Sequence, residues 1–209
     1  MNTFWYYNVC TVIILNIIVT NKDLTLKITS SPLFESCLCF VKNEEILNSV
    51  DKDRTLNIIL WIIAKLYEDK QMMYKLNNEN VFNLFYKYLE TKNSCIKEPI
   101  LQYIVRLIQN YEKETIKIVM INQKLLFSLL NVIEFDKANK NLTLSLCIII
   151  RLIQIGKDEC NDIFSSFING SNITDIVDAL MIRSDDKSVL SACNTLRQEI
   201  SFFVDQMFD

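Results

Sequence analysis

The amino-acid sequence predicts an all-α fold, an α-solenoid of about four to five helical repeats, on three observations. The tetrapeptide RLIQ begins at Arg106 and again at Arg151, 45 residues later. Apolar residues recur at the three- and four-residue spacing of a helix, as in Leu101, Ile104 and Ile108. The chain contains 2 Gly and 2 Pro, so it lacks the turn residues that β-hairpins use.

β-Strands are the competing interpretation of the isoleucine-rich runs, because β-branched residues favour sheets. Those runs show no sustained alternation of apolar and polar residues, which a half-buried strand requires. Helices are therefore the better interpretation.

The repeat has four copies, each an apolar helix followed by a turn. The aligned residues are Asn16, Lys65, Arg106 and Arg151, which are 49, 41 and 45 residues apart. A short apolar helix is predicted after each copy, over residues 33–41, 81–89, 125–133 and 173–181. One helix pair cannot bury its apolar faces alone, so the pairs must stack. The predicted repeats span about residues 8–54, 55–99, 100–142 and 143–187, with a C-terminal cap over 188–209.

Two prolines and one glycine mark boundaries in this register. Pro32 and Pro99 are expected at the starts of helices, where the missing backbone N–H costs nothing. Gly156 is expected in the turn between two helices of the last full repeat.

The apolar segment over residues 4–19 could be a signal peptide, a membrane anchor or a buried helix. It is 16 residues long, whereas a membrane span needs about 20. No Lys or Arg precedes it, and no small-residue cleavage site follows it. We therefore expect a buried helix of the first repeat and no membrane association, with a membrane-anchored helical protein as the alternative.

Composition argues against most catalytic classes. The chain has no histidine, which excludes a Ser-His-Asp triad, a Cys-His dyad and an HExxH zinc site. Two isolated glycines cannot form a phosphate-binding loop or a dinucleotide fingerprint. Asp158, Glu159 and Asp162 fall within about one helical turn, but we interpret them as a solvated face. We expect no enzyme activity, no metal and no cofactor.

The charge and the cysteine content limit which partners and which cellular compartment are expected. The net charge of −3 argues against strong nonspecific nucleic-acid binding, which needs a basic surface. The 7 cysteines are odd in number and lie mostly in apolar runs. We expect them, including Cys37 and Cys39, to be reduced and buried, as in an intracellular protein of the cytoplasm or nucleus.

The RLIQ-like helix, its turn and the following short helix resemble an armadillo or HEAT-type repeat protein over residues 8–204. The period of 41 to 49 residues falls in the range of those repeats. Within that superfamily the layout is similar to a shortened, divergent importin-α, and the resemblance implies a right-handed α-solenoid.

The same resemblance implies an expectation about which peptides the chain would bind. Importin-α proteins bind basic peptides through Trp and Asn residues spaced four apart on concave helices. Basic residues replace Asn in three of the equivalent pairs and would repel a basic peptide. The pairs are Val12/Asn16, Trp61/Lys65, Gln102/Arg106 and Cys147/Arg151.

These observations together predict a noncatalytic protein–protein interaction module, an adaptor or scaffold that binds a protein segment or peptide on its concave face. Nuclear transport is the process that the resemblance suggests. The alternative is a structural subunit of a larger assembly, which would present exposed apolar patches. The predicted binding residues are polar positions on the short helices, able to hydrogen-bond an extended backbone. They are Glu35, Asn83, Lys87, Ser128, Asn131, Asp175 and Asp178.

Overall fold

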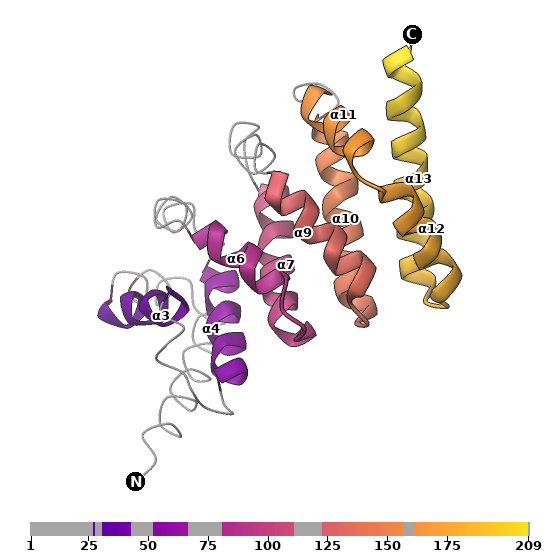
Figure 1. Ribbon diagram of the computed structural model, residues 1–209. Helices are drawn as coiled ribbons and strands as arrows, with labels where there is room; N and C mark the ends of the chain where they lie inside the picture. The colour runs from indigo at the N-terminus through magenta and orange to yellow at the C-terminus, as the bar shows by residue number, and fades with distance from the viewer. Residues whose placement is uncertain are drawn as a thin grey trace. The chain divides into compact units, whose positions relative to one another are not determined.

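The computed structural model describes residues 27, 31–42, 52–66, 81–110, 123–156 and 161–208. Within these ranges every regular element is an α-helix, which confirms the all-α prediction (Figure 1). The helices are α3 (Pro32–Lys42), α4 (Lys52–Leu66), α6 (Val81–Leu89), α7 (Ser94–Asn110), α9 (Gln123–Phe135), α10 (Asn139–Gly156), α11 (Asn161–Gly170), α12 (Ile173–Arg183) and α13 (Lys187–Phe208).

The apolar segment over residues 4–19 lies outside the described residues. None of the helices in the described ranges has both the length and the apolar character needed to cross a membrane.

The chain divides into two compact parts, which we call unit 1 (Met1–Tyr103) and unit 2 (Ile104–Asp209). The boundary falls within α7. Unit 1 contains α3, α4, α6 and the N-terminal part of α7, and unit 2 contains the rest of α7 with α9 to α13.

In unit 1, α3 packs against α4. Phe34, Leu38 and Val41 of α3 are buried, and their spacing of four and three residues places them on one face of the helix. The C-terminal end of α3 is held by α6, because the Tyr88 hydroxyl donates a hydrogen bond to the Val41 carbonyl at 2.9 Å. This bond satisfies a carbonyl that has no partner within its own helix.

Aromatic residues of α6 and α7 form part of the core of unit 1. The rings of Phe85 and Tyr103 meet edge to face, with centroids 4.9 Å apart, a favoured aromatic geometry. Tyr86 is also buried, and burial raises its pKa to about 12 because the phenolate would be poorly solvated.

In unit 2, two helix pairs lie side by side. The long helices α10 and α13 pack against each other, and so do the shorter helices α9 and α12 (Figure 1). α9 also packs on α10, α12 packs on α13, and α11 contacts α10. The buried face of α10 comprises Leu142, Leu146, Ile149, Leu152 and Ile153, which recur at helical spacing.

Side-chain hydrogen bonds fix the register of α10 against α13. The hydroxyls of Thr143 and Ser188 are 3.3 Å apart, and the Gln154 amide donates to Glu199 at 2.8 Å. Both pairs are separated by 45 residues, so the two helices run parallel. The separation equals that of the repeated RLIQ motif.

Two aspartates organise the starts of the long helices. Asp136, which is buried, accepts the backbone N–H of Ala138 at 2.8 Å and the side-chain amide of Asn141 at 3.3 Å. Asp186 directly precedes α13 and accepts the backbone N–H groups of Ser188 and Val189 at 2.9 and 3.1 Å. This is the hydrogen-bonding pattern of a helix N-cap.

The prediction for Pro99 is wrong: α7 begins at Ser94, and Pro99 lies inside the helix. The Asn93 side-chain oxygen accepts the backbone N–H of Cys95 at 3.0 Å, which starts the helix earlier. Proline lacks the N–H that would bond to the Cys95 carbonyl, so the helix lacks that bond. Pro32 is the first residue of α3, as predicted.

The prediction that the cysteines are buried is also wrong for most of those described. Cys39, Cys95 and Cys147 are exposed, whereas Cys193 is buried. Cys147 follows Leu146 and precedes Ile148, both buried, but a helix directs consecutive side chains in different directions. An apolar run in the sequence therefore does not make each of its residues part of the core.

Replacing Leu146 by Ala tests the importance of the α10 core. Leu146 has no exposed surface, so Leu146→Ala should lower the free energy of unfolding by about 3 kcal/mol. Ile182 is 88% exposed, and Ile182→Ala should change it by less than about 0.5 kcal/mol. Urea unfolding followed by far-UV circular dichroism measures both, and equal effects would contradict the assignment of this core.

The Asp186 cap predicts a pH-dependent stability. The side-chain hydrogen bond from Ser188, then the N–H of Val189, lower the pKa of Asp186. Its contribution should be present above the pKa of an unfolded aspartate, about 3.9. It should be lost as the pH falls through the lower pKa of the folded state.

Asp186→Asn should therefore lower the melting temperature at neutral pH, and the difference from the unmodified protein should shrink in acid. Asp185→Asn is the matched control, because it removes the neighbouring exposed carboxylate. Thermal melts of all three proteins at several pH values make the comparison. Identical pH profiles for the two variants would refute the role of Asp186.

Candidate functional site

The sequence-predicted binding residues are divided between the two units. Glu35 on α3 and Lys87 on α6 are exposed in unit 1, and Asn131 and Asp175 are exposed in unit 2. Asn83 belongs to α6, but its side chain lies outside those described.

Of the predicted residues, Ser128 is inaccessible to solvent and Asp178 already forms an ion pair. Ser128 is 2% exposed, which corrects the expectation that it faces a groove. It stands three residues after Leu125 and four before Val132, both buried, so the helical spacing places it on the inner face. Asp178 pairs with Arg197, with 3.4 Å between the carboxylate oxygen and Nε.

The structure instead contains a groove in unit 2, along the long helices. It has a volume of about 520 Å³ and lies between α10, α13 and the C-terminal part of α7. We call it the α10–α13 groove. Cys147, Arg151, Ser188 and Ser191 line it and are exposed, so it opens to solvent.

The lining of the groove combines a polar set with an apolar set. The polar residues are Gln109, Thr143, Cys147, Arg151, Gln154, Ser188, Ser191 and Thr195. The apolar residues are Val105, Ile108, Ile148, Ile150 and Ala192. Hydroxyl and carboxamide groups both donate and accept hydrogen bonds, which suits an extended polypeptide backbone.

Two hydrogen bonds join the long helices along the groove. The Thr143 and Ser188 hydroxyls are in contact near the start of α10, and the Gln154–Glu199 hydrogen bond lies about three turns further along. Between Thr143 and Gln154, α10 rises by about 16 Å. That distance corresponds to about five residues of an extended chain.

The exposed thiol of Cys147 lies within this span, and neighbouring protein atoms reduce its solvation. Desolvation raises the pKa of Cys147, since the thiolate is less well solvated than in free solution. The buried thiol of Cys193 on α13 is affected more strongly: burial raises its pKa to about 11, and nearby Arg183 opposes the rise.

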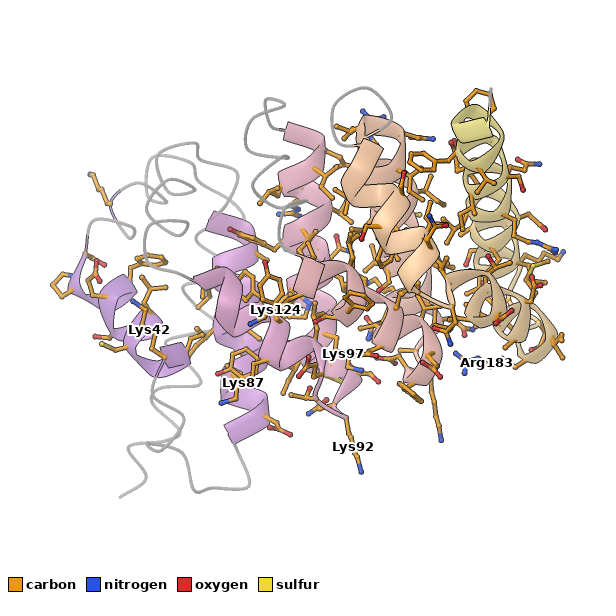
Figure 2. The ribbon with its side chains drawn as sticks, turned by 45° about the horizontal axis from the view of Figure 1, so that its top comes forward. Lys42, Lys87, Lys92, Lys97, Lys124 and Arg183 are labelled. Atoms are coloured by element: carbon orange, nitrogen blue, oxygen red, sulfur yellow. The ribbon has the colours of Figure 1, made fainter. Side chains whose placement is uncertain are left out.

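A second feature of unit 2 lies at the C-terminal ends of α9 and α12. The Arg183 guanidinium donates hydrogen bonds to the carbonyls of Ile133 and Glu134. The arginine lies at the end of α12 (Figure 2). A cation at the C-terminal end of a helix also interacts favourably with the helix dipole. We call this arrangement the Arg183 clamp.

Several basic residues of unit 1 lie at or just after the C-terminal ends of helices. Lys42 ends α3, Lys87 lies in the last turn of α6, and Lys92 follows that helix (Figure 2). Positive charge in the last turn of a helix complements the dipole, so this placement is explained by local helix electrostatics.

The side chains of Asp158, Glu159 and Asp162, which the sequence analysis interprets as a solvated face, lie outside those described. Elsewhere in the described ranges, no group of three His, Cys, Asp or Glu residues is placed to hold a metal ion.

Sequence reasoning placed the binding residues on the short helices, whereas the groove lies on the long ones. The sequence contained one signal for the groove. Cys147 and Arg151, four residues apart, are one of the pairs that the resemblance equates with the Trp and Asn residues of importin-α. Both line the groove. The contribution of α13, through Ser188, Ser191 and Thr195, depends on tertiary packing that sequence spacing does not reveal.

Comparison with known proteins does not assign the chain to a family. No protein-family model matches the chain, and no curated protein matches it significantly.

The two thiols of unit 2 should differ in reactivity. At neutral pH, iodoacetamide should modify Cys147 in the folded protein and leave Cys193 unmodified until the protein unfolds, because Cys147 is exposed and Cys193 is buried. The rate at Cys147 should keep rising above the ordinary thiol pKa of about 8.5. Peptide mass spectrometry measures both sites, and modification of Cys193 at the same rate as Cys147 would contradict the structure.

Proposed function

We propose that this chain is a noncatalytic protein–protein interaction module, an adaptor or scaffold that holds an extended segment of a partner protein. The observation that carries the proposal is the α10–α13 groove. Its length suits about five extended residues, and its lining offers both hydrogen-bonding groups and apolar side chains.

The repeat architecture belongs to the same proposal: a right-handed α-solenoid of armadillo or HEAT type. Long-range hydrogen bonds within unit 2 support it, because they join residues 45 to 50 positions apart. In unit 1, Tyr88 and Val41 are 47 positions apart, and Asn93 and Asp53 are 40 apart. Bonds at these separations are what stacked repeats of this period would make.

An extended segment fits the groove better than a compact small molecule. Pockets for small ligands enclose most of the ligand surface. Here Cys147, Arg151 and Ser191 line the cavity yet are exposed. An open groove lined by both polar and apolar groups can bind a backbone while apolar side chains of the segment contact the partly exposed Val105 and Ile150.

A structural subunit of a larger assembly is the second candidate, and one observation favours it. Phe127, Phe135, Ile182 and Phe202 are exposed. Phe135 ends α9 and Ile182 is next to last in α12, and the Arg183 clamp holds these two helix ends together. Exposed apolar residues on neighbouring helix ends, as Phe135 and Ile182 are here, are typical of protein contact surfaces.

Blocking the groove distinguishes the two candidates. Thr195 lines the groove, whereas Asn194 is exposed on the same helix and does not line it. Thr195→Trp should fill the groove and lower partner recovery by about tenfold, a change of about 1.4 kcal/mol in binding. Asn194→Trp is the matched control and should bind as the unmodified chain does.

The measurement is affinity purification from the native cell with quantitative mass spectrometry, using tagged full-length variants of equal circular dichroism. A partner that also shields Cys147 from iodoacetamide identifies the groove as the contact. A stoichiometric partner recovered equally by Thr195→Trp, but lost with Phe135→Ser combined with Ile182→Ser, would overturn the groove proposal and support the structural subunit.

A further inference from the structure

We propose that the occupant of the α10–α13 groove is an internal, extended partner segment that carries an aspartate or glutamate, whose carboxylate pairs with Arg151. This inference rests on the proposed function and specifies its ligand. Its basis is charge complementarity: among all the residues that line the groove, Arg151 alone carries a formal charge.

The surroundings of Arg151 leave its guanidinium facing solvent. Arg151 is exposed, and among the described residues it makes one hydrogen bond, from Nη1 to the Gln154 side-chain oxygen at 3.4 Å. A guanidinium has five N–H donors. Most of its donors therefore have no partner among the described residues, and a carboxylate can accept two of them side by side.

Gln154 links Arg151 to the neighbouring helix α13. Its amide nitrogen donates to Glu199 on α13 at 2.8 Å, so its amide oxygen is turned towards Arg151. The two bonds connect the guanidinium to both long helices.

The position of Arg151 favours a side chain over a chain terminus. Polar lining continues on both sides of it along α10, with Thr143 and Cys147 before it and Gln154 after it. A segment that ended at Arg151 would leave one side of this lining without a ligand. An acidic side chain lets the backbone continue in both directions.

Peptide display on the full-length protein tests the inference. The probe is a library of random heptapeptides with Gly-Ser linkers on both sides, so that no free terminus enters the groove. The unmodified chain should select peptides with Asp or Glu at one fixed position. Arg151→Glu should replace that preference with Lys or Arg, because the charge of the groove is reversed.

Lys140→Glu is the matched control. Lys140 is an exposed basic residue of the same helix and does not line the groove, so this variant should select the same peptides as the unmodified chain. For one selected peptide, replacing its acidic residue by the amide should weaken binding about tenfold to the unmodified chain and little to Arg151→Gln. Arg151→Lys should give an intermediate loss, since it keeps the charge and loses the paired donors.

The outcomes separate this inference from the function on which it rests. Peptides that shield Cys147 from iodoacetamide but show no acidic preference would overturn the inference and leave the peptide-binding function supported. Unchanged selection by Arg151→Glu would also overturn it. If no selected peptide shields Cys147, both the inference and the proposed function fail.

Discussion

The parallel packing of α10 against α13 is the constraint on which the rest of unit 2 depends. Apolar faces hold the two helices together, with Leu146 and Leu196 fully buried. Apolar contact alone is nondirectional and would tolerate sliding. The polar bonds at Thr143–Ser188 and Gln154–Glu199 supply the register. The groove follows from that register, because its two walls keep fixed positions only if the helices do not slide.

Single polar side chains set three of the helix starts in the described ranges, those of α7, α10 and α13. Asn93, Asp136 and Asp186 each accept a backbone N–H within three residues. Asp186 also accepts the side-chain amide of Asn139 at 3.1 Å, so the cap of α13 is bonded to the start of α10. Local capping and the packing of neighbouring helices therefore depend on the same carboxylate.

Periodicity was sufficient to predict where the short helices lie. Residues 81–89 were predicted as a helix and are α6 (Val81–Leu89), and 173–181 fall within α12 (Ile173–Arg183). Prediction failed where side-chain chemistry overrides the pattern, as at Pro99 within α7. It also failed for Ser128, although its spacing from Leu125 and Val132 indicates burial. The groove could not be predicted in full, since half of its lining comes from helices brought together by tertiary packing.

The Arg183 clamp has a consequence for cooperativity. Carbonyls at the end of a helix need partners from outside that helix, and those of Ile133 and Glu134 receive theirs from a residue about 50 positions later. When α12 detaches, α9 loses the donors that terminate it, so the last turn of α9 cannot remain as stable as before. Opening of one helix thereby destabilises its neighbour, and local unfolding spreads across unit 2 instead of stopping at a single helix.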